Sequence, residues 1–354
     1  PFYMPCATKM AVKHLTSSDL KAIGIQAIIS NALVLELSRG SRYIEKHGGI
    51  HALMNFHGTI FTDSGGFQMI RESFYERTTE NGVIFRDPIN QKKEFLATPE
   101  FVTHIQSHMG SDVAMILDDH NAHTHGKEKH AEAVLRTYEW GKRCAAARIN
   151  PKQLMFGIIQ GGTYLDLRKK SAKLMESLDF DGMALGGLAT GEPIPIMKKV
   201  VSTVTKIIDK NKPRYLMGLG SPVEMLNTIG MGIDCFDSTY PTQNARHNTL
   251  FTEKGKIDIA KARYLHDDNP VDEDCECYTC TNYSRAYLCH LAKAEEPIAM
   301  RMKTYHNVFF MKNLMEEAKI AIKENRFQKF EKEFVKNFIK KKNSEGKQKN
   351  VTIL

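Results

Sequence analysis

Short apolar stretches that end in polar or acidic residues recur along this chain of 354 residues, and they limit the folds it can adopt. One is Phe61–Gln68 (FTDSGGFQ), where an apolar lead-in reaches Asp63 and then a Ser-Gly-Gly turn. Glycines let the backbone approach a ligand closely, so we expect Asp63 at a strand exit beside free backbone amides. The pattern returns in Val113–Asp119 (VAMILDD), Met155–Gln160 (MFGIIQ), Met183–Leu188 (MALGGL), Tyr215–Ser221 (YLMGLGS) and Ile233–Ser238 (IDCFDS).

Helical segments separate these strands. A helix is expected to begin with Thr98 as its cap and Pro99 at its first position, and to end at Gly110. Further helices are expected at Lys127–Arg148, Tyr164–Leu178 and Ile194–Asp209, and Ser221–Glu224 is expected to form a capping box. This alternation, repeated close to eight times, predicts a (β/α)₈ barrel. An open doubly wound sheet is the alternative, although no G-x-G-x-x-G motif follows an early strand.

A barrel of this kind presents its catalytic groups at the carboxyl ends of its strands. The candidates at those ends are Asp63, Asp118, Asp119, Gln160, Gly187, Met217 and Asp237. A single acid in such a place is more commonly a helix cap or a turn former. Several acids at the strand exits of one barrel would converge on one mouth, and this favours an enzyme.

The composition, with 42% apolar and 25% charged residues, is that of an ordinary soluble globular protein. No apolar run approaches the roughly 18 residues that a membrane span needs, and no secretory leader is recognised. The net charge of +8 fits either a solvated lysine-rich face or contact with nucleic acid phosphates. Seven cysteines, three of them within six residues, favour a reducing compartment and a metal site over a disulfide framework.

The three clustered cysteines are Cys275, Cys277 and Cys280. Thiolates at this spacing can reach one tetrahedral zinc ion, which then needs a fourth ligand. The candidates for that ligand are Cys289, His290 and His306. Three cysteines with one distant histidine suit a closed structural site without an open position for water. A reactive or accidental group of thiols is the alternative reading.

The metal site predicts a division of the chain. We expect a zinc-binding subdomain at residues 263–306, inserted near the end of a catalytic barrel that comprises residues 1–262 and 307–338. Helical apolar spacing over Phe309–Phe338 predicts helices that pack on the barrel or on a partner subunit. Residues 339–354 are a lysine-rich tail, of which Lys340–Lys349 is expected to be disordered.

Several motifs follow one another in a fixed order over about residues 1–335: FTDSGGFQ, GVIFRDP, SDVAMILDD, MFGIIQGG, DGMALGGLATGE, YLMGLGSP, GIDCFDSTYPT, and CECYTC followed by YSRAYLCHL. Together they resemble the tRNA-guanine transglycosylase family. The resemblance implies a zinc-containing (β/α)₈ barrel that acts on the anticodon loop of tRNA. It also implies exchange of the wobble guanine of GUN-anticodon tRNAs for a 7-deazaguanine, preQ1 or queuine, by a cytoplasmic homodimer.

The resemblance also implies a role for each matching residue. These roles are Asp237 as nucleophile, Asp63 as general acid/base, Asp118, Gln160 and Gly187 as readers of the base edge, Leu188 as a backbone contact, and Phe67 and Met217 as the faces that enclose the ring. Arg246 and Gln243 would hold the nucleotide next to the target. His306 would be the fourth zinc ligand, because 25 residues separate it from Cys280 as in the family, and His290 would be an ordinary helix residue.

Three positions depart from the family pattern. His120 stands where bacterial members commonly carry cysteine, and Gln243 stands where arginine is usual. Gln243 lacks the charge and the fork of arginine, so the hold on the neighbouring nucleotide is expected to differ. Thr190 stands where valine is common in bacterial members. This position borders the space for the 7-substituent of the incoming base, and threonine there favours a base with a small substituent, such as preQ1.

Three rival functions share parts of this pattern. A non-catalytic tRNA-docking subunit would keep the barrel and the zinc but lose the acids, whereas Asp63, Asp118 and Asp237 are all present. A paralogue that modifies DNA shares every feature above. A metal-dependent hydrolase on the same barrel would need histidine or acidic ligands at the mouth, and the strand ends show no such set of histidines.

Overall fold

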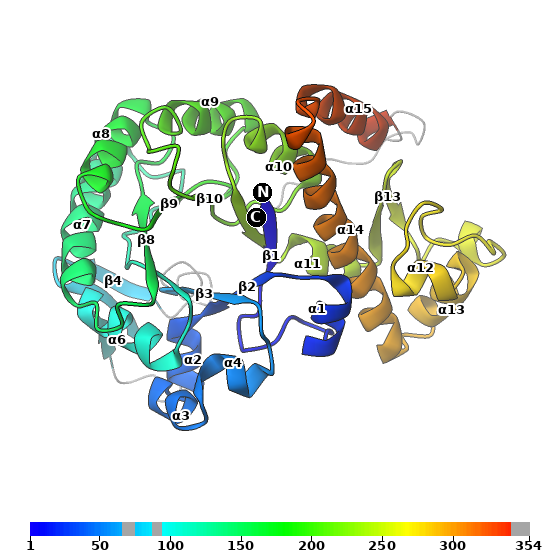
Figure 1. The fold of residues 1–354 in the computed structure, drawn as a ribbon, viewed down its shortest axis with the longest axis horizontal. Coiled ribbons are helices and arrows are strands. Elements are labelled where there is room, and N and C mark those ends of the chain that lie inside the picture. The colour runs from blue at the N-terminus through cyan, green and yellow to red at the C-terminus, as the bar shows by residue number, and fades with distance from the viewer. Residues whose placement is uncertain (66–74, 87–93, 341–354) are drawn as a thin grey trace.

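The structure, a computed structural model, describes residues 1–65, 75–86 and 94–340. At its centre lies an eight-stranded parallel sheet in the order β1-β11-β10-β9-β8-β7-β3-β2. The strands are β1 (Phe2–Pro5), β2 (Ala27–Asn31), β3 (Thr59–Asp63), β7 (Val113–Met115), β8 (Leu154–Ile159), β9 (Gly182–Leu185), β10 (Arg214–Leu216) and β11 (Cys235–Ser238). A parallel bridge between Cys6 and Ile29 joins the two edges, so the sheet curls into a nearly closed barrel (Figure 1). The predicted (β/α)₈ architecture is confirmed.

Helices connect the strands and surround the barrel (Figure 1). They are α1 (Ser17–Ile23), α2 (Ala32–Ser38), α3 (Ser41–Lys46), α4 (Gly49–Met54), α6 (Pro99–Met109), α7 (Lys127–Ala146), α8 (Leu165–Glu176), α9 (Ile194–Val204), α10 (Pro222–Ile229) and α11 (Tyr240–Arg246). As expected, the Thr98 side chain caps α6 by accepting a hydrogen bond from the Phe101 N–H. The predicted capping box before α10 is wrong, because the Ser221 side chain makes no capping hydrogen bond. Burial raises the pKa of the Glu224 carboxyl above its ordinary value, and the charge of Glu192 acts in the same direction.

Between β3 and α6 the chain forms a separate antiparallel sheet. β4 (Tyr75–Thr79) and β5 (Gly82–Arg86) pair across a turn at Glu80 and Asn81, and β6 (Glu94–Ala97) pairs with β5. The indole N–H of Trp140, on α7, donates a hydrogen bond of 2.8 Å to the carbonyl of Glu80 in that turn. This contact joins the small sheet to the helical layer of the barrel.

Aromatic side chains fill the barrel beneath the strand ends. Phe61 of β3 packs edge-on against Phe156 of β8 and Tyr215 of β10, with ring centroids 5.6 and 6.1 Å apart. Gly157 of β8 makes room for a further ring, since a β-carbon there would lie 2.6 Å from the Phe180 ring. Because neighbouring strand residues point to opposite faces, Gly157 faces the helical layer, where Phe180 also approaches Gly141 of α7, and the packing leaves no space for a larger side chain at this position.

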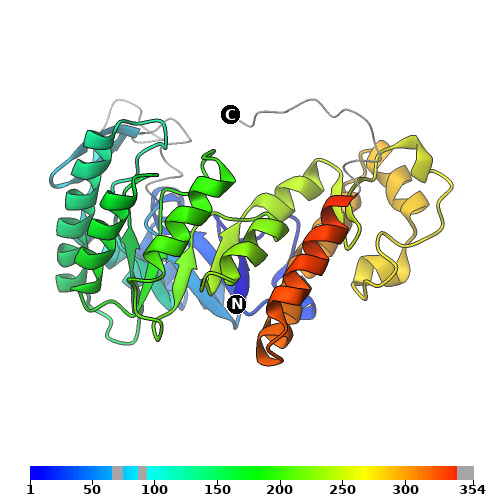
Figure 2. The same ribbon diagram turned by 90° about the horizontal axis from the view of Figure 1, so that it is seen from above.

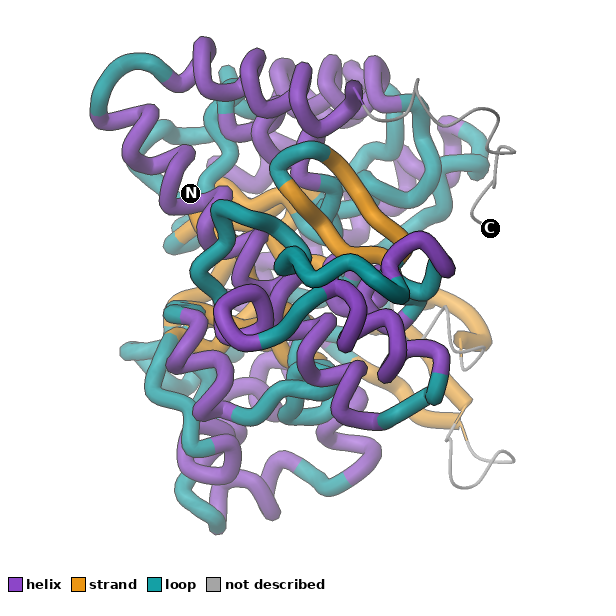
Figure 3. Tube along the Cα trace, turned by 90° about the vertical axis from the view of Figure 1, so that its right-hand side faces the viewer, coloured by secondary structure: helices purple, strands orange, loops and turns teal. Residues whose placement is uncertain are grey.

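After β11 and α11 the chain builds a lobe beside the barrel and then returns to it (Figure 2). The lobe contains the hairpin β12 (Thr249–Thr252) and β13 (Gly255–Asp258), a 3₁₀ turn at Ala262–Tyr264, α12 (Tyr278–Asn282) and α13 (Arg285–Lys293), which lie together in Figure 3. α14 (Pro297–Lys323) leads from the lobe along the barrel, and α15 (Phe327–Lys340) packs against α10 and α14.

The C-terminal helices that the sequence predicts are present. The helical spacing expected over Phe309–Phe338 belongs to two helices, α14 and α15, separated by a turn at Glu324–Arg326. In the predicted tail Lys340–Lys349, Lys340 alone belongs to the described residues, and the other residues of the tail lie outside them. None of the described helices is both long and apolar enough to cross a membrane.

Replacing Gly157 by alanine is expected to lower the free energy of unfolding by about 1–3 kcal/mol, because the added methyl group overlaps the Phe180 ring in a close-packed core. Urea unfolding followed by circular dichroism measures the change. The control is Gly126→Ala before α7, where φ is −65° and the added methyl group meets only a flexible Glu128 oxygen. Equal unfolding free energies in the two variants would contradict the packing argument.

Candidate active site and metal centre

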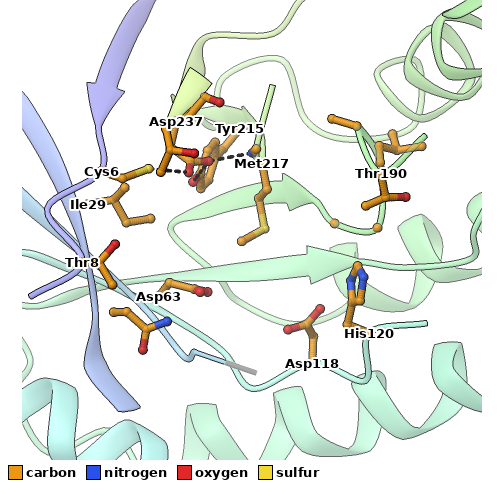
Figure 4. A pocket seen from close by; sticks show the side chains of 18 of the residues that line it. Cys6, Thr8, Ile29, Asp63, Asp118, His120, Thr190, Tyr215, Met217 and Asp237 are labelled. Carbon is orange, nitrogen blue, oxygen red and sulfur yellow. Dashed lines mark hydrogen bonds between the residues drawn. The ribbon is translucent and has the colours of Figure 1, made fainter. Parts of the chain in front are cut away.

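A cavity of about 430 Å³ opens at the carboxyl ends of the barrel strands. Its lining includes Asp63 at the end of β3, Asp118 after β7 and Asp237 in β11. The three carboxyl groups face one hollow although they come from distant parts of the chain (Figure 4). The convergence of acids on one mouth that the sequence predicts is therefore observed for these three residues.

Asp237 is fixed by three donors. Its Oδ1 accepts hydrogen bonds from the Tyr215 hydroxyl at 2.6 Å and from the Gly218 N–H at 2.7 Å. Its Oδ2 accepts a hydrogen bond from the Cys6 thiol at 3.4 Å. Burial raises the pKa of Asp237 above its ordinary value, and the three donors act in the opposite direction. A carboxylate held in this way beside an open hollow is suited to nucleophilic attack.

Asp63 is placed to carry a proton. Burial raises its pKa from 3.8 to about 7, and the charges of Asp118 and Asp237 act in the same direction. The backbone N–H groups of Gly65 and Ser64 lower this pKa but do not restore the ordinary value. They belong to the turn that the sequence places after β3, where Gly65 has a φ of 90°. A carboxyl group that titrates near neutral pH can both give and take a proton.

Asp118, Gln160 and Gly187 form a contiguous polar group. The Gln160 amide donates a hydrogen bond of 2.5 Å to the Asp118 carboxylate, and burial still raises the pKa of Asp118 to about 6. A β-carbon on Gly187, where φ is 64°, would lie 2.6 Å from the Gln160 amide oxygen. Asp118 and Gly187 line the cavity, whereas Gln160 lies behind them and is 2% exposed. The group presents donors and acceptors suited to a flat polar ligand.

The other residues assigned by resemblance lie in different surroundings. Met217 points into the cavity (Figure 4), and Leu188 lines it as well. Phe67, expected to face Met217 across the ligand, lies outside the described residues. Arg246 and Gln243 are on α11, the helix that follows β11, and neither lines the cavity.

Asp119 does not join the other acids. Its carboxylate pairs with Arg136 of α7 at 2.5 Å, and its N–H donates to the Thr137 hydroxyl at 2.9 Å. The prediction that this residue lies at the mouth is wrong, because neighbouring residues at an extended strand end point to opposite sides. Asp119 therefore joins the barrel to a helix instead of serving the cavity.

Sequence reasoning missed two partners of Asp237. Tyr215 carried a usable signal, since it lies two residues before Met217 and alternate residues of a strand share a face. Cys6 carried none, because it lies 231 residues from Asp237 in the chain and meets it only through the pairing of β1 with β11.

A second cluster, apart from the cavity lining, consists of Cys275, Cys277, Cys280 and His306. Their ligand atoms all lie within 4.8 Å of one another, and the His306 Nδ1 is 3.8, 3.5 and 3.3 Å from the three sulfur atoms in that order. The other ring nitrogen lies 2.7 Å from the carbonyl oxygen of Phe251, which leaves Nδ1 free as a ligand. Three thiols and one imidazole in this arrangement fit a closed tetrahedral metal site.

Of the three candidates for the fourth ligand, the structure places His306 beside the three cysteines, and not Cys289 or His290. His290 is exposed on α13, and the Cys289 thiol donates to the carbonyl of Lys261 at 3.5 Å. Because His306 belongs to α14, a metal ion bound here would join the lobe to the helix that leads back to the barrel. No other group of three or more possible metal ligands occurs among the described residues.

Comparison with known proteins gives a consistent result. Residues 1–340 match the family model described as queuine tRNA-ribosyltransferase. The chain is 43% identical over 339 residues to the queuine tRNA-ribosyltransferase of Caldanaerobacter subterraneus. The aligned region covers 96% of this chain and 90% of the relative. Relatives of the same name from Macrococcus caseolyticus and Listeria monocytogenes are 44% and 43% identical, each over 96% of this chain and 89% of the relative.

Asp63→Asn is expected to stabilise the protein at pH 8 but not at pH 4. The folded state keeps the Asp63 proton up to about pH 7, whereas the unfolded chain releases it near pH 3.8, so this carboxyl costs stability as the pH rises between those values. The uncharged amide avoids that cost, which we expect to be about 3–5 kcal/mol at pH 8.

Urea unfolding at both pH values measures this effect. The control is Asp268→Asn, which alters an exposed acid in the lobe. A gain that is the same at pH 4 and pH 8, or no gain at all, would contradict the raised pKa of Asp63.

His306→Ala is expected to leave the purified protein with much less than one bound metal ion per chain and with a lower Tm, because a structural metal ion stabilises the fold that binds it. Elemental analysis of the protein gives the metal content. The control is His290→Ala, which changes an exposed histidine of the same lobe and should retain the ion. Loss of metal from the His290 variant alone would reassign the ligand.

Proposed function

Because the chain belongs to the queuine tRNA-ribosyltransferase family, we propose that it is a tRNA-guanine transglycosylase of queuosine modification. It exchanges the wobble guanine of tRNAs with GUN anticodons for a 7-deazaguanine, without ATP and without strand cleavage. The observation that carries this proposal is the meeting of Asp63, Asp118 and Asp237 in one cavity of about 430 Å³. Such a cavity holds a single purine, which must leave its stack to enter, as base-modifying enzymes require.

In the first half of the reaction Asp237 is the nucleophile. Its carboxylate forms a bond to C1′ of the ribose as the bond between C1′ and N9 of guanine breaks, and the bonding pair goes to N9. Asp63, which is partly protonated near neutral pH, gives its proton to the departing base. The products are free guanine and an ester between Asp237 and the tRNA.

The second half runs the same steps with another base. The 7-deazaguanine enters the cavity and gives its N9 proton to the Asp63 carboxylate. N9 then attacks C1′, and the ester electrons return to Asp237. Two displacements at one carbon retain its configuration, as in retaining glycoside cleavage with two carboxyl groups.

Asp118, Gln160, Gly187 and Leu188 are assigned to recognition of the base. The Asp118 carboxylate accepts hydrogen bonds from N–H groups on the base edge, and Gln160 fixes its orientation. The buried guanidinium of Arg168 donates to the carbonyl of Gly187 at 3.3 Å, which holds that part of the backbone in place. Met217 covers one face of the ring, and Phe67 is proposed for the other.

Thr190 and His120 are assigned to the space around the 7-substituent, since both line the cavity. Glu192 holds the loop of Thr190 by accepting its N–H at 3.0 Å and that of Ala189 at 2.6 Å. Thr190 is nearly isosteric with valine and favours a small substituent, as in preQ1. His120 replaces a smaller residue and changes this wall, so both preQ1 and queuine are candidate substrates.

Zinc is the proposed metal ion, because thiolates and imidazole in tetrahedral geometry are its usual ligands. It stabilises the subdomain proposed at residues 263–306 and, with all four positions taken by protein, supplies no chemistry at the cavity. None of the seven cysteines forms a disulfide, which together with a tRNA substrate fits a cytoplasmic enzyme.

The tRNA anticodon loop is proposed to contact α11, where Arg246 is half-buried and Gln243 is exposed. A homodimer, in which one subunit orients the tRNA for the other, is proposed as the assembly. The lobe offers a suitable face for a second copy, since Tyr283 and Tyr287 stack with ring centroids 5.4 Å apart and Tyr287 is 44% exposed.

The test of this function is base exchange on tRNA. We expect the protein to incorporate labelled guanine into GUN-anticodon tRNA and, after incubation with preQ1 or queuine, to yield the modified nucleoside detected by mass spectrometry. Asp237→Asn is expected to abolish exchange, a loss of at least about 10³-fold, because no covalent intermediate forms.

Two controls separate the rivals. Duplex DNA of the same sequence should accept no label, and incorporation into DNA instead of tRNA would favour the DNA-modifying alternative. Absence of exchange by the folded wild-type protein, together with restoration on adding a catalytic partner chain, would favour the docking-subunit alternative.

A further inference from the structure

The two oxygens of the Asp237 carboxylate are held unequally. Oδ1 accepts two hydrogen bonds from strong donors, the Tyr215 hydroxyl at 2.6 Å and the Gly218 N–H at 2.7 Å. Oδ2 accepts a single hydrogen bond from another described residue, the Cys6 thiol at 3.4 Å. Figure 4 shows these three contacts at one end of the cavity. The carboxylate therefore has one firmly bound oxygen and one lightly bound oxygen.

A thiol is a weak hydrogen-bond donor, so it orients an oxygen without engaging its lone pairs as strongly as a hydroxyl or an amide. Oδ1, with two short hydrogen bonds, would lose both if it became the attacking atom. Oδ2 gives up only the thiol contact when it forms a new bond. Forming a new covalent bond therefore costs less free energy at Oδ2 than at Oδ1.

We infer that Oδ2 of Asp237 is the oxygen that bonds to the ribose, and that Cys6 is a positioning residue that aims this oxygen into the cavity. The inference rests on the proposed function for its chemistry, whereas the contact between Cys6 and Asp237 is independent of it. Nothing in the quoted sequence motifs singles out Cys6, since the first of them, FTDSGGFQ, begins at Phe61.

The backbone around Cys6 is fixed from two sides. Met4 of β1 pairs with Asp237 of β11, and Cys6 bridges to Ile29 of β2. The backbone that carries the thiol is thus fixed where the barrel closes, and it cannot shift without breaking that closure. A donor on such a rigid support can hold a reacting oxygen within the narrow tolerance that catalysis requires.

The Cys6 thiol keeps its proton. Burial raises its pKa well above the ordinary value, and the carboxylates of Asp237 and Asp63 act in the same direction. A thiol in these surroundings is a poor nucleophile and a lasting donor. Cys6 therefore acts on Asp237 and does not form a covalent bond with the substrate itself.

This assignment gives each atom a part in the reaction. Oδ2 bonds to C1′ as the bond from C1′ to N9 breaks, the electron pair passes to N9, and Asp63 supplies the proton that N9 takes up. Oδ1 becomes the carbonyl oxygen of the ester and keeps its Tyr215 and Gly218 donors. In the return step Oδ2 regains its negative charge and the Cys6 hydrogen bond. The thiol proton does not move throughout.

The test compares Cys6→Ala and Cys6→Val, which lack the donor, with Cys6→Ser, which retains one. The pKa of Asp237 is measured by carboxyl-carbon NMR on the protein alone, and the rate of tRNA adduct formation is measured against pH. Loss of the donor is expected to raise the pKa of Asp237 by about 0.5–1 unit. At low pH it should slow adduct formation by about 3–10-fold, while KM for guanine stays unchanged. Cys6→Ser should restore both values.

Valine fills the volume of the cysteine side chain, so Cys6→Val can still be compared with Cys6→Ser if Cys6→Ala folds poorly. The control is Cys144→Ala, which removes a buried thiol of α7 and should leave the pKa of Asp237 and the pH profile unaltered. An Asp237 pKa that is the same in the wild type, valine and serine proteins would overturn the role of Cys6. The NMR result stands even if the wild-type protein forms no tRNA adduct, which would count against the proposed function alone.

Discussion

The burial of three carboxyl groups governs the chemistry of this cavity. Asp63, Asp118 and Asp237 share one hollow, and burial makes the charged form of each carboxyl less favourable than it is in water. Burial and these neighbours raise the pKa of Asp63 to about 7, while donors oppose the rise at Asp237. We therefore propose that the charge resides on Asp237 and the proton on Asp63. In this proposal a nucleophile and a proton carrier arise from the same residue type, and their difference comes from hydrogen bonding.

A rigid frame is needed to keep such groups together, and the barrel provides it. Each acid follows a different parallel strand, and the strands are held in register by the sheet. The packed aromatic core of Phe61, Phe156 and Tyr215 lies beneath them, and Tyr215 also reaches up to bind Asp237. Folding energy spread over this whole core offsets the local cost of burying the acids. This explains why the site belongs at the mouth, where the core ends.

Much of this arrangement could be predicted from the sequence, because it depends on local patterns. Apolar strands followed by acids predicted the barrel and its mouth, and the spacing of Cys275, Cys277 and Cys280 predicted the metal cluster. What failed depends on tertiary contacts. Asp119 is adjacent to Asp118, yet it turns towards Arg136 of a later helix. Cys6 meets Asp237 across 231 residues, and no spacing rule reports such a contact.

In the proposed reaction Asp237 carries the charge and forms the bond to tRNA, while Asp63 carries the proton. The most direct measurement is to trap the protein on tRNA, digest the complex with nuclease and protease, and locate the attached ribose by tandem mass spectrometry. We expect the ribose on the peptide that contains Asp237, linked through its side-chain carboxyl. A ribose linked to Asp63 or Asp118 would contradict these roles.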